Sequence, residues 1–387
     1  MDFGFTKEEE AFREELRGFL SQELGPEYKG RTPYELFSRD FSRKLAQKGW
    51  LGVGWPKEYG GGGRPYMEQL VYGEEMMRHR APAGAHILAQ NMVGPTLIRI
   101  GSEEQKKEYL PKILSGEITF CLGYTEPNAG TDLAACQTTA VLDGDEWVIN
   151  GSKIFTSFAG QAHYAWMTVR TDPNAPKRHR GLSMFIVDMK TPGITVREMD
   201  TMFDYIQYEV FFDDVRVPRT AVVGELNKGW DYLTTALDHE RVFMGGTVAQ
   251  HQRFFEELVE YAKKTERDGK PLTKDPIIRQ RLAQLAIELQ IGRLFAYRVA
   301  WLLSNGIVPF SEASITKTFT SELERRLANI AVHIMGPCGT LLEGKWAPYD
   351  GYMAWEYKFS PMMAVGGGSN EIERIIIAIA GLGLPRP

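Results

Sequence analysis

The spacing of apolar residues at the start of the chain is that of a helix. Apolar side chains recur on one face of this segment, namely Phe12, Leu16 and Phe19. Thr6 and Glu9 precede them at the separation of a capping box, in which each side chain accepts the backbone N–H of the other residue. Helical spacing continues to about residue 118, apart from glycine-rich loop material within residues 52–63. We therefore expect an N-terminal helical domain over residues 1–118.

From residue 119 the pattern changes to short β-rich runs separated by turns, which indicates a β domain over residues 119–230. The clearest runs are 147–149, 164–169, 182–187 and 209–212. Two dipeptides in this region, Asp143-Gly144 and Asn150-Gly151, reach positive φ angles at low cost, as tight hairpin turns require. We expect a turn at each of them.

Helical spacing then returns, and we expect a helical bundle domain over residues 231–387. Asp275 suits a helix cap, and Pro276 suits the first helical position after it. Beyond them, residues on one face step by four and three in turn: Ile278, Leu282, Leu285, Leu289, Gly292, Ala296, Val299 and Leu303. Such a seam is typical of long antiparallel helices in a bundle. The last helix is expected after a run of glycines, with Asn370 at its cap and Glu373 at its third position.

Composition narrows the class of protein. The 387 residues exceed a single ordinary core, and 43% hydrophobic with 25% charged residues is a globular mixture. A net charge of −5, with basic residues scattered among acids, makes nucleic acid a poor partner. No apolar run is long enough for a membrane span and the first residues lack the features of a secretion signal, so we expect a cytoplasmic protein. The three cysteines have neither metal-binding nor disulfide spacing, and we expect no metal.

The segment from Tyr124 to Asp132 combines turn-forming residues with hydroxyl groups. Its sequence, Tyr-Thr-Glu-Pro-Asn-Ala-Gly-Thr-Asp, bends the backbone so that amides and the Thr125 and Thr131 hydroxyls converge on one ligand. By composition alone the same segment is an ordinary turn at a domain boundary. The other motifs of the chain decide between these interpretations.

This segment resembles the signature of the acyl-CoA dehydrogenase family, which reads Thr-Glu-Pro, any residue, Ala-Gly-Ser/Thr-Asp. Further segments that resemble the family follow in family order over nearly the whole chain: 49–61, 151–157, 212–218, 371–374 and 382–386. The resemblance implies an α+β fold with an N-terminal helical domain, a middle β-barrel or sandwich domain and a C-terminal four-helix bundle. It also implies FAD as cofactor and an acyl-CoA substrate, which loses a proton and a hydride to give an enoyl-CoA.

The same resemblance implies which residues lie along the flavin and its phosphates. They are Leu122, Tyr124, Thr125, Gly130, Thr131, Phe155, Thr156, Ser157, Ser369 and Glu371. Hydroxyl and amide donors stabilise the negative charge that the ring gains on reduction, which suits Thr125 and Ser157. Phe155 offers an aromatic face to the ring. Ser369 and Glu371 open a helix, whose first amides suit a phosphate.

The reaction needs a carboxylate beside the carbon α to the thioester. In many relatives a Glu of the C-terminal loop supplies it, but this chain has Gly367 at that place. A minority of the family places the base on the helix that opens the C-terminal domain, and Glu240 stands at the matching position, so we expect Glu240 to be the base. The alternative is that Asp238, Glu240 and Arg241 form a solvated helix face.

The resemblance also implies residues that contact the substrate. Asp238, Arg241 and Thr131 are expected along the coenzyme A arm, where Arg suits anionic groups. In relatives the backbone N–H at the place of Gly367 donates to the thioester carbonyl. Glycine keeps this donor and leaves space for a branched or bulky acyl group.

Two segments depart from the family pattern. Relatives build half of the FAD site across a subunit interface with an Arg shortly before Phe-Gly-Lys, but this chain has Thr265 in the Arg place and Asp268 in the Phe place. Near the adenine, relatives carry a Gln followed by Gly-Gly, where residues 333–339 read His-Ile-Met-Gly-Pro-Cys-Gly. We therefore expect a dimer or tetramer that is either homomeric with substitute contacts or heteromeric with a sister chain supplying them.

Three functions remain open at this point. The first is a catalytic acyl-CoA dehydrogenase that passes its electrons to an electron-transferring flavoprotein. The second is a non-catalytic or half-site partner subunit of a heteromeric acyl-CoA dehydrogenase. The third is an oxygen-using flavoenzyme on the same scaffold.

Overall fold

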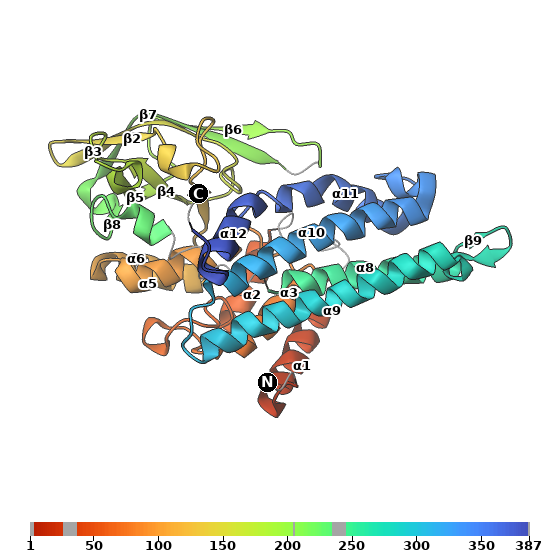
Figure 1. Ribbon diagram of the computed structural model, residues 1–387. Coiled ribbons are helices and arrows are strands. Elements are labelled where there is room, and N and C mark those ends of the chain that lie inside the picture. The colour runs from red at the N-terminus through yellow and green to blue at the C-terminus, as the bar shows by residue number, and fades with distance from the viewer. Residues whose placement is uncertain (1–3, 26–36, 204–205, 234–244, 386–387) are drawn as a thin grey trace. The chain divides into compact units, whose positions relative to one another are not determined.

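The computed structural model describes residues 4–25, 37–203, 206–233 and 245–385 (Figure 1). Its contacts divide the chain into two compact units. The bundle unit comprises Met1–Pro33, Pro65–Ala81 and Arg241–Pro387, and the sheet unit comprises Tyr34–Arg64 and Pro82–Glu240. The first part of the chain thus contributes helices to both units, and each unit has hydrophobic clusters of its own.

The sheet unit contains the β domain and the helices packed on it. Its strands are β1 (Phe120–Gly123), β2 (Thr139–Asp143), β3 (Glu146–Lys153), β4 (Tyr164–Arg170), β5 (Leu182–Asp188), β6 (Ile194–Met199), β7 (Gln207–Pro218) and β8 (Val222–Val223). Its helices are α2 (Arg39–Gln47), α4 (His86–Leu88), α5 (Gly94–Ile100) and α6 (Glu103–Leu114). Shorter helical turns are η2 (Lys57–Tyr59), η3 (Ala89–Val93), η4 (Leu133–Ala135), η5 (Arg178–Gly181) and η6 (Arg219–Ala221).

The strands form one sheet in the order β6-β7-β3-β2-β4-β5-β8, with β1 parallel to β4. The two halves of this sheet meet where Thr139 of β2 pairs with Arg170 of β4. Figure 1 shows α5 and α6 along one side of the sheet. There Leu97 and Ile113 of these helices join Trp166 of β4 in one buried cluster. The β domain predicted from the short β-rich runs is therefore confirmed.

One of the two predicted turns in this domain is wrong. Asp143-Gly144 does turn the chain between β2 and β3, with Gly144 at φ +63°. Asn150-Gly151 instead lies inside β3, where the pairing with β7 shifts by a residue and Gly151 takes φ +143°. The reason is that the Asn150 amide exchanges two hydrogen bonds of 2.9 Å with Asp214 of β7, which fixes a β-bulge in place of a turn.

The bundle unit consists of helices and one short hairpin. Its helices are α1 (Lys7–Glu23), α3 (Tyr66–Arg78), α8 (Thr247–Lys264), α9 (Pro276–Ser304), α10 (Phe310–Met335), α11 (Tyr352–Met363) and α12 (Asn370–Ile376). Strands β9 (Glu266–Arg267) and β10 (Lys270–Pro271) form the hairpin, and the helical turns are η7 (Leu272–Lys274), η8 (Gly336–Thr340), η9 (Pro348–Gly351) and η10 (Ile377–Gly381). None of the helices that the structure describes has both the length and the apolar composition needed to cross a lipid bilayer.

The local signals for helix starts are confirmed at two places. The Thr6 hydroxyl accepts the Glu9 N–H, and the Glu9 carboxylate accepts the Thr6 N–H, which completes the capping box of α1. Asp275 caps α9 through the amides of the next turn, and Pro276 occupies its first position. The predicted seam of α9 is buried apart from Leu303, which is partly buried.

The predicted cap of the last helix is wrong by one residue. Ser369 caps α12, since its hydroxyl accepts the Ile372 N–H at 3.4 Å. The Asn370 side chain is buried and accepts hydrogen bonds from Lys317 and Ser321 of α10 instead. A tertiary contact has therefore replaced the local one.

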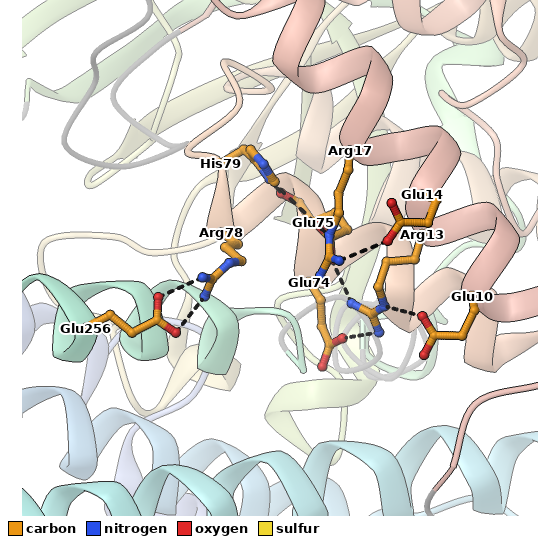
Figure 2. A network of polar contacts seen from close by, with 9 residues as sticks. All are labelled: Glu10, Arg13, Glu14, Arg17, Glu74, Glu75, Arg78, His79 and Glu256. Carbon is orange, nitrogen blue, oxygen red and sulfur yellow. Dashed lines mark hydrogen bonds and ion pairs between the residues drawn. The ribbon is translucent and has the colours of Figure 1, made fainter.

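A buried ionic network fixes α1 against α3 (Figure 2). The Arg13 guanidinium donates to the Glu75 carboxylate at 2.7 Å and to the Glu74 carboxylate at 2.8 Å. Arg17, which is more exposed, donates to the second oxygen of Glu75 at 3.1 Å. Burial would lower the pKa of Arg13, but the charges and hydrogen bonds of both carboxylates outweigh it and raise that pKa, so Arg13 stays charged.

Candidate functional site

The predicted ligand loop forms a closed turn at the end of β1. The Glu126 N–H donates to the Ala129 carbonyl and the Ala129 N–H donates to the Glu126 carbonyl, both at 3.0 Å. Pro127 and Asn128 at the tip are exposed, as are Gly130 and Thr131 after it. The predicted bend is thus present, and Thr131 is accessible to a ligand.

A buried ion pair connects this loop to β3. The Lys153 ammonium, at the end of β3, donates to Oε1 of Glu126 at 2.7 Å and to the Tyr124 carbonyl at 3.3 Å. The other Glu126 oxygen accepts the Gln137 N–H, and Oε1 also accepts the Thr138 N–H at 3.0 Å. Burial alone would raise the pKa of Glu126, but the Lys153 charge and these hydrogen bonds lower it to about 2.

Sequence reasoning gave Lys153 and Glu126 no role, although both lie in segments that resemble the family. Lys153 occupies an inward position of β3, where Trp147 and Ile149 are also buried. A lysine at an inward strand position needs a partner, because an unpaired buried charge is costly. The inward position of Lys153, together with the carboxylate of Glu126 in the neighbouring motif, could have identified this ion pair from the sequence.

The second predicted flavin segment, Phe155 to Ser157, is tied to the loop. The Ile154 N–H donates to the Thr125 carbonyl at 2.9 Å, and the Thr156 N–H donates to the Tyr208 carbonyl of β7 at 3.0 Å. The structure therefore brings the Thr125 and Phe155 segments side by side. The Ser157 hydroxyl donates to the Gln207 side-chain oxygen at 3.1 Å.

Leu122 and Tyr124 contribute side chains to the core of the sheet unit. Both are partly buried against the cluster that contains Trp166. The Tyr124 hydroxyl accepts the indole N–H of Trp166 at 2.8 Å. Trp166 was assigned no role from the sequence, although this residue holds the predicted site residue Tyr124 in place.

These segments suit one side of a flavin ring. Phe155 adopts φ +53°, a strained value for a residue with a side chain, and the residue is 57% exposed. The Thr156 hydroxyl oxygen is buried and has no hydrogen-bond partner among the described residues. An exposed aromatic face beside unused hydrogen-bonding capacity is the combination that an isoalloxazine ring requires.

In the bundle unit, a run of glycines connects α11 to α12. Gly367 takes φ +68° and Gly368 takes φ +101°. A Cβ on Gly367 would meet no atom within 4 Å, whereas a Cβ on Gly368 would lie 2.6 Å from the Glu373 carboxylate. Ser369 caps α12, and Glu371 in its first turn is exposed. Hydrogen bonds from its own backbone and from Ser369 lower the pKa of Glu371.

A buried cluster of titratable side chains was also missed in the sequence. His251 of α8, Glu324 of α10 and Glu356 of α11 are each at most 3% exposed, and Nε2 of His251 lies 3.2 Å from Oε2 of Glu324. Burial raises the pKa of Glu324 to about 7. Burial, together with Glu324, also raises the pKa of Glu356. Burial lowers the pKa of His251 to about 4, so we interpret the contact as a neutral hydrogen bond and not an ion pair.

Three predicted residues, Asp238, Glu240 and Arg241, lie outside the described residues. Within the part of the chain that the structure describes, no group of three His, Cys, Asp or Glu side chains is arranged to hold a metal ion.

Comparisons with known proteins agree along the whole chain. Family models described as acyl-CoA dehydrogenase N-terminal, middle and C-terminal domains match residues 6–117, 121–215 and 227–382. Acyl-CoA dehydrogenase FadE26 of Mycobacterium tuberculosis is 35% identical over 100% of this chain and 99% of its own length.

Two solved structures are similar in both sequence and fold. The steroid acyl-CoA dehydrogenase Tcur3481-Tcur3483 superposes with a TM-score of 0.93 at 37% identity, over 100% of both chains. The ChsE4-ChsE5 complex from Mycobacterium tuberculosis gives a TM-score of 0.91 at 35% identity, also over 100% of both chains.

Proposed function

Since this chain belongs to the acyl-CoA dehydrogenase family, we propose that it oxidises a coenzyme A thioester to its α,β-unsaturated form with Glu240 as the base. The supporting observation is the hydrogen bond from the Ile154 N–H to the Thr125 carbonyl. It joins the two segments that carry the proposed flavin contacts. The buried Lys153–Glu126 ion pair also connects the two segments.

The cofactor of the proposed reaction is FAD, which when bound supplies the ring that accepts the β-hydrogen as hydride. Phe155 offers its exposed face to that ring, and the hydroxyl groups of Thr125, Thr156 and Ser157 supply hydrogen bonds to its polar edge. Leu122, Tyr124, Gly130 and Thr131 contribute backbone along the same surface. Ser369 and Glu371, at the start of α12, would approach the phosphates, with the Glu371 carboxylate turned to solvent.

Glu240 would take the α-proton of the substrate. The loop between α11 and α12 offers no alternative, because residues 364–369 read Ala-Val-Gly-Gly-Gly-Ser and hold no carboxylate. A positioned base of this kind contributes roughly 10²–10⁴-fold to the rate. Asp238 and Arg241, on the same stretch of chain, would flank the coenzyme A arm together with Thr131.

Gly367 would donate its backbone N–H to the thioester carbonyl. This hydrogen bond acidifies the α-carbon, because it stabilises the negative charge that develops on the carbonyl oxygen. Among the described residues, the Gly367 N–H has no other acceptor. The space beside its α-carbon is open, which suits a bulky acyl group.

Reduction of ferricenium with a panel of acyl-CoA thioesters tests this function. We expect turnover with at least one thioester and a loss of about 10²-fold or more in kcat for Glu240→Gln. Glu343→Gln, which replaces an exposed carboxylate of the bundle unit, is the control and should keep full activity. Full activity in Glu240→Gln would remove Glu240 from the mechanism, and rapid reoxidation of the reduced enzyme by air would favour an oxidase.

The turn between β9 and β10 favours a more specific proposal, that the chain is one subunit of a heteromeric enzyme for a steroid-sized acyl-CoA. Asp268 and Gly269 form this exposed hairpin turn, and Thr265 before it carries no cation for a pyrophosphate. Two similar solved proteins carry paired names, and one of them is described as a steroid enzyme. A sister chain would then supply the missing half of the FAD site.

Purification of the chain alone and with a co-expressed sister chain separates the alternatives. For the heteromer we expect low FAD content and low activity in the isolated chain, with both restored in the pair. Full FAD occupancy and turnover in the isolated chain would show a homomeric enzyme. Electron-transferring flavoprotein should then replace ferricenium as the acceptor in either form.

A further inference from the structure

A single buried lysine contacts the glycine loop between α11 and α12 from the neighbouring helix α10. The Lys317 ammonium donates to the Ala364 carbonyl at 3.3 Å, to the Gly368 carbonyl and to the Asn370 side-chain oxygen at 2.9 Å. Only 7% of Lys317 is exposed. The ammonium therefore holds the loop on both sides of Gly367.

We propose that Lys317 is a positioning residue, which fixes the loop so that the Gly367 N–H meets the thioester carbonyl of the substrate. The proposal rests on the function given above to Gly367. Lys317 does not touch the reacting atoms in this scheme, but acts through the backbone that it holds.

The loop needs such a clamp because of its composition. Residues 366–368 are three consecutive glycines, and glycine has the largest backbone freedom to lose. A hydrogen-bond donor at the end of such a segment would sample many directions, whereas catalysis requires a donor fixed in advance.

The remaining contacts of the loop close it into one defined shape. The Asn370 N–H donates to the Ala364 carbonyl at 2.9 Å, and the Gly366 N–H donates to the Met362 carbonyl at 2.8 Å. Ser321 of α10 donates its hydroxyl to the same Asn370 oxygen as Lys317, at 3.0 Å. Among the described residues, these contacts leave the N–H groups of Gly367 and Gly368 without an acceptor.

The position of the lysine charge suits the helix that precedes the loop. Ala364 is the C-cap of α11, and a cation at a helix C-terminus is favourable because the last carbonyls carry partial negative charge. The Lys317 ammonium thus satisfies both a helix end and the carbonyl of Gly368. A neutral side chain of the same length would leave the Gly368 carbonyl without this donor and the Ala364 carbonyl with the Asn370 N–H alone.

Hydrogen exchange of the FAD-loaded enzyme tests the clamp directly. In Lys317→Met, we expect the hydrogen-bonded amides of Ala364, Val365, Gly366 and Asn370 to exchange about tenfold faster or more, while the rest of α10 keeps its protection. Asn370→Ala is the second variant, because it removes one acceptor of Lys317 with a small change in volume. Lys274→Met, which replaces an exposed lysine of the same unit, should leave the exchange unchanged.

A spectroscopic probe tests the catalytic consequence. The absorption of a 3-arylacryloyl-CoA moves to longer wavelength when its carbonyl accepts a hydrogen bond, because the bond stabilises the charge-separated form of the conjugated chain. We expect the wild type to produce this shift, and both variants to bind the probe with most of the shift lost. In turnover, kcat should fall by about tenfold or more with little change in KM for the thioester.

The outcomes separate the two proposals. A wild type that neither oxidises any acyl-CoA nor shifts the probe refutes the proposed function, and the catalytic role of Lys317 with it. An active wild type with unchanged exchange and unchanged probe spectra in both variants refutes the role of Lys317 alone. If Lys317→Met fails to fold, Asn370→Ala decides between these outcomes.

Discussion

Nζ of Lys153 lies 2.7 Å from Oε1 of Glu126, and the two side chains are 0% and 5% exposed. The pair connects the end of β3 to the loop that follows β1, and these carry the two segments proposed to bind the flavin. Its strength therefore bears on the shape of the proposed cofactor surface as well as on stability.

Removal of one partner of this pair should be costly. Lys153→Met leaves the Glu126 carboxylate buried with only backbone amides as donors, and we expect a loss of roughly 3–5 kcal/mol of unfolding free energy. In the double variant Lys153→Met/Glu126→Gln, part of this loss should be recovered because no buried charge remains. Urea unfolding at pH 7 measures both, with Lys190→Met as an exposed control in the same unit. A loss in Lys153→Met no larger than in the control would contradict the prediction.

The same pair should make the enzyme sensitive to acid. The pKa of Glu126 lies at about 2, below its ordinary value of 4.5, so the folded state holds the ionised form more strongly than the unfolded state does. The stabilisation is therefore present above about pH 4.5 and is lost as the pH falls toward 2. We expect the wild type to lose roughly 2 kcal/mol more than the double variant between pH 5 and pH 3. Equal acid sensitivity of the two proteins would rule out this linkage.

The network in Figure 2 predicts unequal effects for two neighbouring arginines. The Arg13 side chain is 8% exposed and contacts the buried carboxylates of Glu74 and Glu75, whereas the Arg17 side chain is 43% exposed. Arg13→Met should cost about 3 kcal/mol, because it leaves Glu74 and Glu75 with buried charge. Arg17→Met should cost at most about 1 kcal/mol, since exposed pairs are weak. Thermal unfolding of the two variants shows which one loses more stability. Similar losses of stability in both would contradict the unequal roles of Arg13 and Arg17 in this network.

Local chemistry made part of this structure predictable from sequence. The capping box of Thr6 and Glu9 and the start of α9 at Pro276 depend on residues a few positions apart, and both are confirmed. The helix, β and helix order also followed from apolar spacing, and it is confirmed together with the family. The Thr-Glu-Pro loop was predicted as a turn for the same local reasons.

Long-range contacts account for what the sequence did not reveal. Asn370 was predicted as a helix cap. Its side chain instead accepts a hydrogen bond from Lys317, which precedes it by 53 residues. Asn150 was predicted in a turn, but Asp214 of β7 holds it inside a strand. The partners of Lys153 and His251 are likewise distant in sequence, and periodicity carries no information on such pairs. The role of Glu240 stays a prediction.

The buried cluster of α8, α10 and α11 should weaken the protein as the pH rises. The pKa of Glu324 is raised from 4.5 to about 7, so the folded state retains a proton that the unfolded state has lost. Its contribution is complete below about pH 4.5 and disappears as the pH rises through 7. His251 titrates in the opposite sense, because its lowered pKa costs stability only as the pH falls below about 6.5. Among the described residues, Tyr352 and Arg80 also interact electrostatically with Glu356.

Glu324→Gln, which imitates the protonated carboxyl group, tests this expectation. The variant should gain on the order of 2 kcal/mol relative to wild type between pH 5 and pH 8. Thermal unfolding at both pH values measures the difference, and Glu343→Gln, which replaces an exposed carboxylate of the same unit, is the control. A variant that parallels the wild type across this range would show that Glu324 ionises normally.

Gly367 should govern which acyl groups the enzyme accepts. A Cβ at this position meets no protein atom within 4 Å, so Gly367→Ala should cost only the strain of φ +68°, about 1–2 kcal/mol. Gly383→Ala is a matched control, because Gly383 has φ +67° and equally open surroundings. If Gly367 faces the acyl group, its alanine variant alone should raise KM for bulky, ring-containing thioesters while sparing short straight-chain ones. Steady-state kinetics with both substrate classes measures this, and a parallel change for the two classes would mean that the open space beside Gly367 does not hold the acyl group.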